Sequence, residues 1–326
     1  MNSNYYIPAP IALFVFNRPH HTLETLLALS KNDNAEKSIL YIYCDGPKDN
    51  ATLEEQQKIK EVREIVESQK WPKKIIVYKS KTNIGLKESI LKGVTQVVNK
   101  HGKIIVLEDD IVTSRGFLNY MNNALYKYEN NKEVMHIGAF MPKTTVYFPL
   151  SEIFFSPFMS CWGWATWKSR WQNLDLDTTN LLSRLSDNKT LYRFNLDGTL
   201  EHHHQLMANA NGKLSTWAIY WYATIFFSNG LCLYPNRSMV KNIGFDNTGV
   251  NCGDEIELYD VDLKEITKVR IKRAVESKIG RNYLKRFYNF GTDSSVRKRL
   301  RIVTQFYIIV LRIKLGYIKK TILNLK

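Results

Sequence analysis

Short apolar runs alternate with amphipathic stretches along the first half of the chain. Four runs rich in β-branched or aromatic residues have the length of buried strands, at residues 11–16, 39–43, 75–78 and 104–107. Between and after them, apolar side chains recur at helical spacing. Strands that alternate with helices predict a mainly parallel central sheet flanked by helices, so we expect an α/β, Rossmann-like fold.

Two of these helices carry start signals. Pro19 suits the first position of a helix that follows the first strand. Thr52 and Glu55 have the spacing of a capping box, which satisfies free N–H groups at a helix start. Each signal therefore marks a helix that follows a predicted strand.

The second half of the chain is less regular. We expect short strands at residues 135–139, 154–155 and 231–235, and a helix at 200–210. Residues 217–227 are apolar on most faces, which is typical of a buried helix. A Gly- and Asn-rich loop is predicted at 242–249. Four tryptophans fall within ten positions, at Trp162, Trp164, Trp167 and Trp171.

Three consecutive carboxylates, Glu108, Asp109 and Asp110, follow the fourth predicted strand. Carboxylates in a row repel one another, so a partner of opposite charge is expected. In open α/β sheets, ligands bind in the crevice beyond the carboxyl ends of the strands. A divalent cation fits this place, because hard cations take oxygen ligands and bridge to phosphates. The alternative is a solvated acidic turn.

Composition adds little to this interpretation. The chain has 326 residues, 44% hydrophobic and 12% aromatic, which supports a packed core. The N-terminus has no basic segment before its first apolar run, and that run is too short to span a membrane, so we expect a cytoplasmic protein. No pair of cysteines has C-x-x-C spacing, so free thiols are expected. The cysteines are Cys44, Cys161, Cys232 and Cys252.

Charge divides the chain into two parts. Residues 264–326 hold 18 Lys and Arg against 3 Asp and Glu. The net charge of this segment, +15, equals that of the whole chain. We therefore expect a neutral domain at residues 1–263 and a basic tail at 264–326. In the tail, a basic run at 296–302 precedes an apolar run at 306–311 and alternating apolar and lysine positions. This pattern is typical of a helix lying in an anionic membrane interface, which would make the protein peripheral on the inner face of the membrane.

Two alternatives exist for the basic tail. One is a C-terminal helix docked on the body. The other is a nucleic-acid-binding arm, which is disfavoured because no interleaved aromatic platform accompanies the charge. We therefore expect no nucleic-acid partner.

Six short motifs, taken in order, resemble those of bacterial glycosyltransferases with the GT-A fold. They are similar to the family-2 enzymes and the N-acetylglucosaminyltransferase I-like group, over about residues 8–255. The motifs are Phe14-Val-Phe-Asn-Arg-Pro19, Cys44-Asp-Gly-Pro47, Asn83-Ile-Gly-Leu86, Val106-Leu-Glu-Asp-Asp110, Cys161-Trp-Gly-Trp-Ala-Thr-Trp167 and Asn242-Ile-Gly-Phe245.

The resemblance implies a role for each motif. The last Asp of the E-D-D triplet, Asp110, would bind Mn²⁺ or Mg²⁺, which bridges the donor diphosphate. Glu108 and Asp109 would contact the donor ribose, the metal-bound waters or the sugar. The remaining donor-binding candidates are Arg18 beside the nucleoside, Asp45 on the base, Asn83 and Lys87 on the far side of the pocket, and Trp162 and Trp164 under the donor sugar. Trp217 is a further donor-binding candidate.

The chain departs from the family at the general base. Inverting enzymes of this group have a carboxylate near the position of Trp217, but here Ala218 and Ile219 follow, and neither can accept a proton. Glu201, Asp246 and Asp254 are the substitute candidates, with Glu201 as the catalytic assignment. The resemblance also leads us to expect a histidine near Asn251, which is absent.

Several candidates have simpler explanations. Arg18 could form a surface salt bridge, Asp45 could be a turn residue, and Trp167 and Trp171 are expected to pack in the core. His202, His203 and His204 are consecutive, so on a helix they point in different directions and make a poor metal chelate.

The expected function is therefore a metal-dependent, inverting hexosyl- or N-acetylhexosaminyltransferase. It would use a nucleotide-sugar donor, with UDP-sugar as first choice, in polysaccharide biosynthesis. The acceptor would be a glycan or a lipid-linked saccharide. The alternative is a non-catalytic module that binds a nucleotide sugar or glycan and has lost its general base. A sugar nucleotidyltransferase is disfavoured, since no Gly-rich turn follows the first strand.

Overall fold

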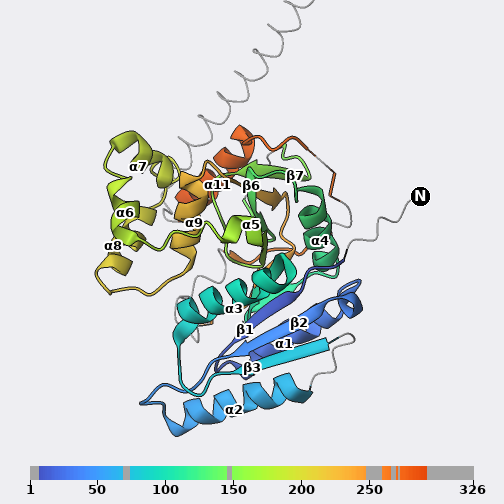
Figure 1. Ribbon diagram of the computed structural model, residues 1–326. Coiled ribbons are helices and arrows are strands. Elements are labelled where there is room, and N and C mark those ends of the chain that lie inside the picture. Colours follow the sequence, from blue (N-terminus) through green and yellow to red (C-terminus); the bar gives the residue numbers. More distant parts are fainter. Residues whose placement is uncertain are drawn as a thin grey trace, which may run out of the picture.

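The computed structural model describes residues 7–68, 74–144, 149–246, 259–265, 269–270 and 272–291 (Figure 1). Within these residues one large sheet has the strand order β3-β2-β1-β4-β8-β6-β9-β7. The strands of its first half are all parallel. They are β1 (Ile11–Val15), β2 (Ile39–Cys44), β3 (Lys74–Lys79) and β4 (Lys103–Glu108).

The second half of the sheet is mixed. Strand β8 runs antiparallel to both neighbours, β4 and β6, and β9 continues parallel to β6. Six strands, β1, β2, β3, β4, β6 and β9, therefore share one direction, while β8 and the edge strand β7 oppose it. The bounds are β6 (Val134–Gly138), β7 (Ile153–Ser156), β8 (Trp164–Trp167) and β9 (Leu231–Pro235).

Helices cover both faces of this sheet (Figure 1). One hydrophobic cluster joins the sheet to α1, α2 and α4, and a second joins its other face to α3, α5 and α9. The bounds of the first seven helices are α1 (Pro19–Ser30), α2 (Leu53–Ser68), α3 (Gly85–His101), α4 (Phe117–Lys127), α5 (Lys168–Trp171), α6 (Thr178–Ser183) and α7 (Asn188–Phe194). Those of the others are α8 (His202–Ala210), α9 (Ala218–Phe227) and α11 (Lys278–Gly291), with a 3₁₀ turn at Ala35–Lys37.

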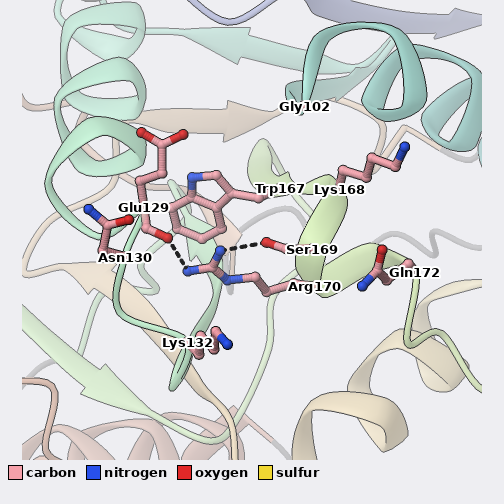
Figure 2. A pocket seen from close by; sticks show the side chains of 9 residues that line it. All are labelled: Gly102, Glu129, Asn130, Lys132, Trp167, Lys168, Ser169, Arg170 and Gln172. Carbon is pink, nitrogen blue, oxygen red and sulfur yellow. Dashed lines mark hydrogen bonds between the residues drawn. The ribbon is translucent and has the colours of Figure 1, made fainter.

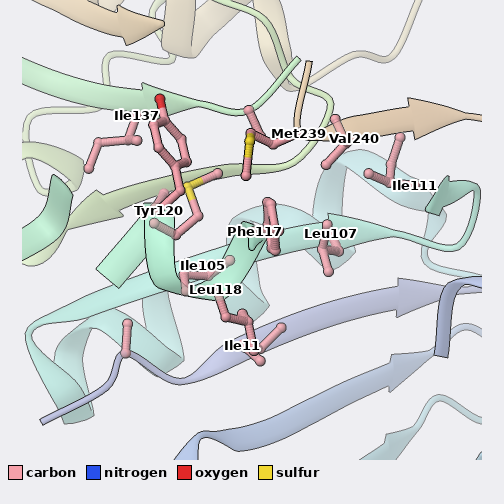
Figure 3. Packing of buried hydrophobic residues seen from close by; sticks show 14 of the residues in the cluster. Ile11, Ile105, Leu107, Ile111, Phe117, Leu118, Tyr120, Ile137, Met239 and Val240 are labelled. Atoms are coloured by element: carbon pink, nitrogen blue, oxygen red, sulfur yellow. The ribbon is translucent and has the colours of Figure 1, made fainter. Parts of the chain in front are cut away.

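The predicted α/β class, with a mostly parallel central sheet flanked by helices, is confirmed. Alternation along the strands explains the two-sided core. In β4, Ile105 and Leu107 face the first cluster, and Ile104 and Val106 face the second. Figure 3 shows the first cluster, where Ile105 and Leu107 lie among side chains from β1 and α4.

Strand β8 explains the tryptophan-rich segment, which sequence reasoning did not assign to a strand. Trp164 and Trp167 are an odd number of positions apart, so they point to opposite faces of the sheet. Trp164 joins the second cluster and Trp167 the first. Both are buried, as is Trp171 in α5, so the expected core positions of Trp167 and Trp171 are confirmed.

A small two-stranded sheet lies beyond the end of β4. Strand β5 (Ile111–Thr113) pairs antiparallel with β10 (Val240–Asn242), residues that are far apart in the sequence. Sequence reasoning missed both strands, since each has only three residues and the second ends at Asn242, where the predicted Gly/Asn loop begins. This pairing places the loop that follows β10 against the carboxylates that follow β4.

Part of the predicted basic tail packs on the body. In α11, Arg281 forms ion pairs with Asp197 and Glu276, and Leu284 and Phe287 are buried. The docked-helix alternative therefore holds for Lys278–Gly291. Residues 292–326, where the membrane-interface pattern lies, are outside the described residues. In the part of the chain that is described, no helix is both long and apolar enough to cross a membrane.

Candidate active site at the carboxyl edge of the sheet

Polar residues collect where the parallel strands end. Arg18 follows β1, Asp45 follows β2, and Asp109 and Asp110 follow β4. Since β1 pairs with both β2 and β4, these residues lie at one edge of the sheet. In the sheet, β2 and β3 lie on one side of β1 and β4 lies on the other, so the strand order reverses at β1. The crevice between β1 and β4 is therefore the expected ligand-binding place.

Arg18 forms ion pairs with two of the three carboxylates. Its Nη2 donates to Asp109 Oδ1 and, at 2.9 Å, to Asp110 Oδ2. All three side chains are largely buried, with exposed fractions of 15% for Arg18, 6% for Asp109 and 7% for Asp110. The alternative of a surface salt bridge is therefore wrong for Arg18. Of the residues predicted for the donor site, Arg18, Asp109 and Asp110 contact one another.

The other terminal nitrogen of the Arg18 guanidinium group, Nη1, is buried and has no hydrogen-bond partner among the described residues. A buried N–H donor without an acceptor costs about 1–3 kcal/mol. Arg18 thus holds an unused donor beside the carboxylates, suited to an anionic oxygen such as that of a phosphate.

The cluster is short of positive charge. One arginine faces the three carboxylates Glu108, Asp109 and Asp110, so the cluster carries two excess negative charges when all are ionised. Burial, reinforced by the two aspartates, raises the pKa of the Glu108 carboxyl to about 8. Burial also raises the pKa of Asp109 to about 6 despite the opposing effect of Arg18. A divalent cation would supply the two missing charges.

A tight loop follows strand β10 and lies against this cluster. Ile243 N donates to the Asp110 carbonyl at 2.9 Å, which places Gly244 directly against the Asp110 and Arg18 side chains. From the other side, the His21 Nε2 of α1 lies 3.2 Å from Ile243 O and 3.1 Å from Asp246 Oδ2. Thr25 of α1 donates to the Asp109 carbonyl at 2.7 Å. The carboxylates are thus held between α1 and the loop.

The donor set fits a hard divalent cation. Asp110, with Asp109 beside it, would hold the cation, and these oxygens now bind Arg18 instead. Within the described ranges, no three His, Cys, Asp or Glu side chains are grouped to hold a metal. Mg²⁺ in particular is bound by one or two carboxylates together with substrate phosphates and waters, so a two-carboxylate site agrees with that chemistry.

Asp45 stabilises the start of α3. Its Oδ1 accepts from Gly46 N and Ile84 N at 2.8 and 2.9 Å, and its Oδ2 accepts from Gly85 N at 2.9 Å and Asn83 Nδ2 at 3.1 Å. Helix α3 has no side-chain cap of its own, so Asp45 satisfies its free N–H groups. The predicted bond from Asp45 to a nucleobase would have to replace one of these four. Asn83 is likewise used within the turn.

Substituting Asp45 by alanine is expected to destabilise the fold by about 2–4 kcal/mol, because buried N–H groups at the start of α3 lose their acceptor. The free energy of unfolding, measured by urea titration, checks this. Asp45→Asn keeps one acceptor oxygen and should lose less. A change below about 0.5 kcal/mol for Asp45→Ala would show that the carboxylate does not hold the helix start.

Lys87 and Trp217 lie where α3 and α9 approach each other. The Lys87 ammonium sits 4.4 Å from the centroid of the Tyr220 ring, in the first turn of α9. Trp217, at the N-cap of α9, is only 3% exposed and stacks on Trp164 with ring centroids 5.0 Å apart. Trp164 is fully buried. Both tryptophans are core residues here, so neither offers a face to a donor sugar, contrary to the sequence expectation.

Trp162 is different, because it is only partly buried and borders the loop over the carboxylates. Its ring packs edge-on against Phe140, Phe245 and Tyr259, with centroids 4.4, 5.5 and 5.1 Å away. Phe245 adjoins Gly244, which contacts Asp110. Trp162 is therefore the member of the tryptophan group that stays a site candidate.

The proposed general bases fall in different places. Glu201 precedes α8, is 78% exposed and bonds to His204 at 2.9 Å, so nothing in its contacts joins it to the carboxylate cluster. Asp246 lies beside the cluster through its contact with His21, and its side chain is 41% exposed. Asp254 and Asn251 lie outside the described residues. The position of Asp246 thus favours it as the general base, whereas sequence reasoning treated it only as one of three candidates.

The three consecutive histidines point to separate partners. His202 packs between Phe158 and Tyr222, His203 bonds to Asn195, and His204 bonds to Glu201. Burial lowers the pKa of His202 to about 4. Their directions match the expectation that they do not converge on one ligand.

A cavity of about 410 Å³ lies at the opposite edge of the sheet (Figure 2). It is bordered by Gly102, immediately before β4, and by Arg170 and Lys168 of α5. The guanidinium of Arg170 donates to four backbone carbonyls between residues 128 and 134, and also to Ser169. Its cation is therefore fully used in fixing the chain after α4, and the cavity is remote from the carboxylates.

Comparison with known proteins gives limited similarity. No protein-family model matches the chain, and no curated protein does. Among solved structures, the mannosyltransferase PcManGT from Pyrobaculum calidifontis in complex with GDP-Man and Mn²⁺ is 10% identical, with a TM-score of 0.37 over 68% of this chain and 70% of that chain. The crystal structure of S. aureus TarS is 14% identical, with a TM-score of 0.28 over 44% of this chain and 24% of that chain. Likenesses of this size assign no function.

Proposed function

We propose that the protein is a metal-dependent glycosyltransferase that takes a sugar from a nucleotide-sugar donor. The observation that carries this proposal is the cluster at the ends of β1 and β4. The three carboxylates Glu108, Asp109 and Asp110 exceed the Arg18 guanidinium by two negative charges when all are ionised, and Arg18 has an unused, buried N–H donor. A divalent cation together with a diphosphate satisfies both needs at once.

The residues of the chain would divide the work as follows. Asp110 holds the cation, with Asp109 and Glu108 beside it toward the ribose and the sugar. When bound, the cation neutralises negative charge on the departing nucleoside diphosphate. The Arg18 guanidinium is positioned to donate to a phosphate oxygen through Nη1. Lys87 is the second cation proposed for the donor, and Trp162 the aromatic residue nearest the loop.

The acceptor hydroxyl must lose a proton as the bond to the anomeric carbon forms. Asp246 is the carboxylate best placed for this, since it adjoins the cluster and is partly exposed, and it replaces Glu201 as our first candidate. An inverting course, a UDP-sugar donor, and a glycan or lipid-linked acceptor remain part of the proposal through the motif resemblance. The transferred hexose or N-acetylhexosamine is proposed on the same ground.

The experiment is a donor screen. The purified protein is incubated with Mn²⁺ and a panel of UDP-, GDP- and dTDP-sugars, and release of nucleoside diphosphate is measured with and without EDTA. Metal-dependent release from one donor class supports the enzyme. Binding of a nucleotide sugar without any turnover would favour the alternative of a binding module that has lost its base.

Gly244→Ala tests whether the loop contact shapes the site. A Cβ at this position would lie 2.9 Å from Arg18 Nη1 and closer still to Asp110 Oδ2, so the pair must shift. We expect an activity loss of about tenfold or more, because a displacement of positioning groups by about 1 Å can cost up to about 10²-fold in rate. Gly138→Ala in β6 is the matched control, since its Cβ would meet its nearest atom at 3.6 Å. Equal activity of the two variants would contradict the contact.

We also propose that the basic tail places the enzyme on the inner membrane surface. Its support is the basic and amphipathic pattern of residues 296–326. Removal of the residues after 294 should abolish sedimentation with vesicles containing phosphatidylglycerol. Unchanged sedimentation would refute this part of the proposal.

A further inference from the structure

A second cavity, of about 460 Å³, lies at the same edge of the sheet as the carboxylates. It opens where β6 and β9 end, at Met141 and Pro142 on one side and at residues 236–238 on the other. Both strands run in the direction of β1 and β4. The cavity and the carboxylate cluster therefore share one face of the molecule.

Basic side chains border this cavity. Lys143, Arg237 and Lys264 face one acidic residue, Asp262, so the lining carries two excess positive charges. Asp262 pairs with Lys143 at 2.7 Å, which leaves Arg237 and Lys264 without an ion pair among the described residues. Arg237 is exposed and Lys264 half-buried. Two unpaired cations at the border of a concave site favour an anionic ligand.

One of the residues that line the cavity has an unused hydrogen-bond acceptor. Asn236 lines it, and Asn236 Oδ1 is buried without a hydrogen-bond partner in the described part of the chain. A buried carbonyl oxygen needs an N–H or O–H donor, which a bare oxyanion does not provide but a sugar hydroxyl does. The residues that line the cavity therefore favour a ligand that has both a negative charge and hydroxyl groups.

The walls are fixed in position. Tyr283 of α11 donates through its hydroxyl to Pro142 O at 2.7 Å and accepts from Thr144 N at 3.2 Å. Ser238 Oγ accepts from Met141 N at 3.2 Å and so joins the exits of β6 and β9. Tyr283 itself is buried. The cavity is therefore a built feature of the fold, and the docked helix α11 supplies one side of it.

A short strand connects this cavity to the carboxylate cluster. Ser238 lines the cavity, β10 follows, and Gly244 contacts Asp110 and Arg18. Six residues of extended chain span at most about 20 Å. A short oligosaccharide bound in the cavity can therefore extend toward the place where the donor sugar would lie.

We infer that this cavity is the acceptor subsite and that it takes an anionic saccharide, with the oxyanion on Arg237 and Lys264 and a hydroxyl on Asn236. The assignment of this cavity to the acceptor rests on the proposed function, whereas the expected binding of an anionic saccharide does not. The oxyanion can be a phosphate or a carboxylate, and both are tested.

Isothermal titration with small probes tests the chemistry directly. Glucose 6-phosphate or glucuronate should bind measurably, and the tighter of the two identifies the oxyanion. Glucose should bind at least tenfold more weakly, and so should inorganic phosphate. Equal binding of glucose would overturn the role of charge. Equal binding of inorganic phosphate would overturn the role of the hydroxyl contact.

Variants locate the binding. Arg237→Gln combined with Lys264→Gln should weaken the better probe at least tenfold, whereas Lys189→Gln combined with Lys213→Gln removes the same charge elsewhere and should not. Arg237→Lys, which keeps the charge, should retain most of the affinity. Circular dichroism melting confirms that each variant is folded. Unchanged affinity in the folded Arg237/Lys264 double variant would overturn the site.

The test is independent of catalysis, because it also applies to the Asp110→Asn protein. That variant should bind the saccharide probe as the unaltered protein does. If no nucleotide sugar is turned over but probe binding depends on Arg237 and Lys264, the anionic subsite stands and the proposed transferase fails. If turnover is found and the probes bind elsewhere, the transferase stands and the subsite fails.

Discussion

Asp110→Asn is expected to abolish metal-dependent release of nucleoside diphosphate, with a loss of at least about 10²–10³-fold. Asparagine keeps the size of the side chain but removes the negative charge that the cation requires. Loss of a single electrostatic group that stabilises a leaving group has this magnitude in other enzymes. Activity over a Mn²⁺ titration is the measurement, and the binding of Mn²⁺ followed by electron paramagnetic resonance is the second readout.

Two features make this variant informative. Asp110 is paired with Arg18, so the Asn variant also loses half of the ion-pair arrangement that holds the guanidinium. Glu64→Gln, an exposed carboxylate-to-amide change on α2, serves as the control and should retain full activity. Normal activity and Mn²⁺ affinity in Asp110→Asn would contradict the assignment of the metal ligand.

Acid should destabilise the protein strongly through His136. This residue is fully buried in β6, where Nε2 faces Ser160 O at 3.0 Å and Nδ1 accepts from the Trp221 indole N–H at 3.2 Å. Burial lowers the pKa of His136 from 6.5 to about 3. The ring is held neutral, with one nitrogen donating and the other accepting, and protonation would break the bond from Trp221.

The direction of the effect follows from the lowered pKa. Above pH 6.5 neither state carries the proton, so the full stability is present. As the pH falls from 6.5 toward 3, the unfolded chain protonates His136 and the folded chain does not, which favours unfolding by up to roughly 5 kcal/mol. Urea midpoints between pH 7.5 and 4.5 measure this loss.

A substitution isolates the contribution of His136. His136→Gln can still donate to Ser160 and accept from Trp221, but it does not titrate, so its midpoints should fall less steeply with acid. His20→Gln, at an exposed position on α1, should keep the slope of the unaltered protein. Identical slopes for His136→Gln and the unaltered protein would show that other groups dominate the acid sensitivity.

Regular elements were predictable where the sequence pattern is local. The predicted strand at residues 11–16 and the helix opened by Pro19 agree with β1 and α1. At the capping box, Glu55 N donates to Thr52 Oγ1 at 3.1 Å, although the Glu55 side chain turns instead toward Asn17. Each of these signals lies within one turn of the chain.

Features that depend on distant partners were not predictable. Strand β8 exists because β4 and β6 are on either side of it, and its sequence looked only like a tryptophan cluster. Asp45 was predicted to face a ligand, but its acceptors are filled by N–H groups of residues 84 and 85, which lie at the start of α3. A polar residue at a strand end looks the same in the sequence in either case.

The candidate site was half visible in the sequence. Arg18 and Asp110 were both predicted for the donor site, and they lie together because the carboxyl ends of the paired strands β1 and β4 meet. The contact of Gly244 with both, and the position of Asp246 beside His21, depend on the pairing of β10 with β5. Nothing local in the sequence encodes that pairing.

Strand β10 also sets a fixed spacing. Its register with β5 pairs Val240 with Thr113 and Asn242 with Ile111, so the number of residues from Ser238 to Gly244 determines how far the cavity lies from Asp110. One added residue would move every later side chain to the other face of the strand. The length of β10 would then select the size of the acceptor, and altering that length offers a way to engineer chain-length preference.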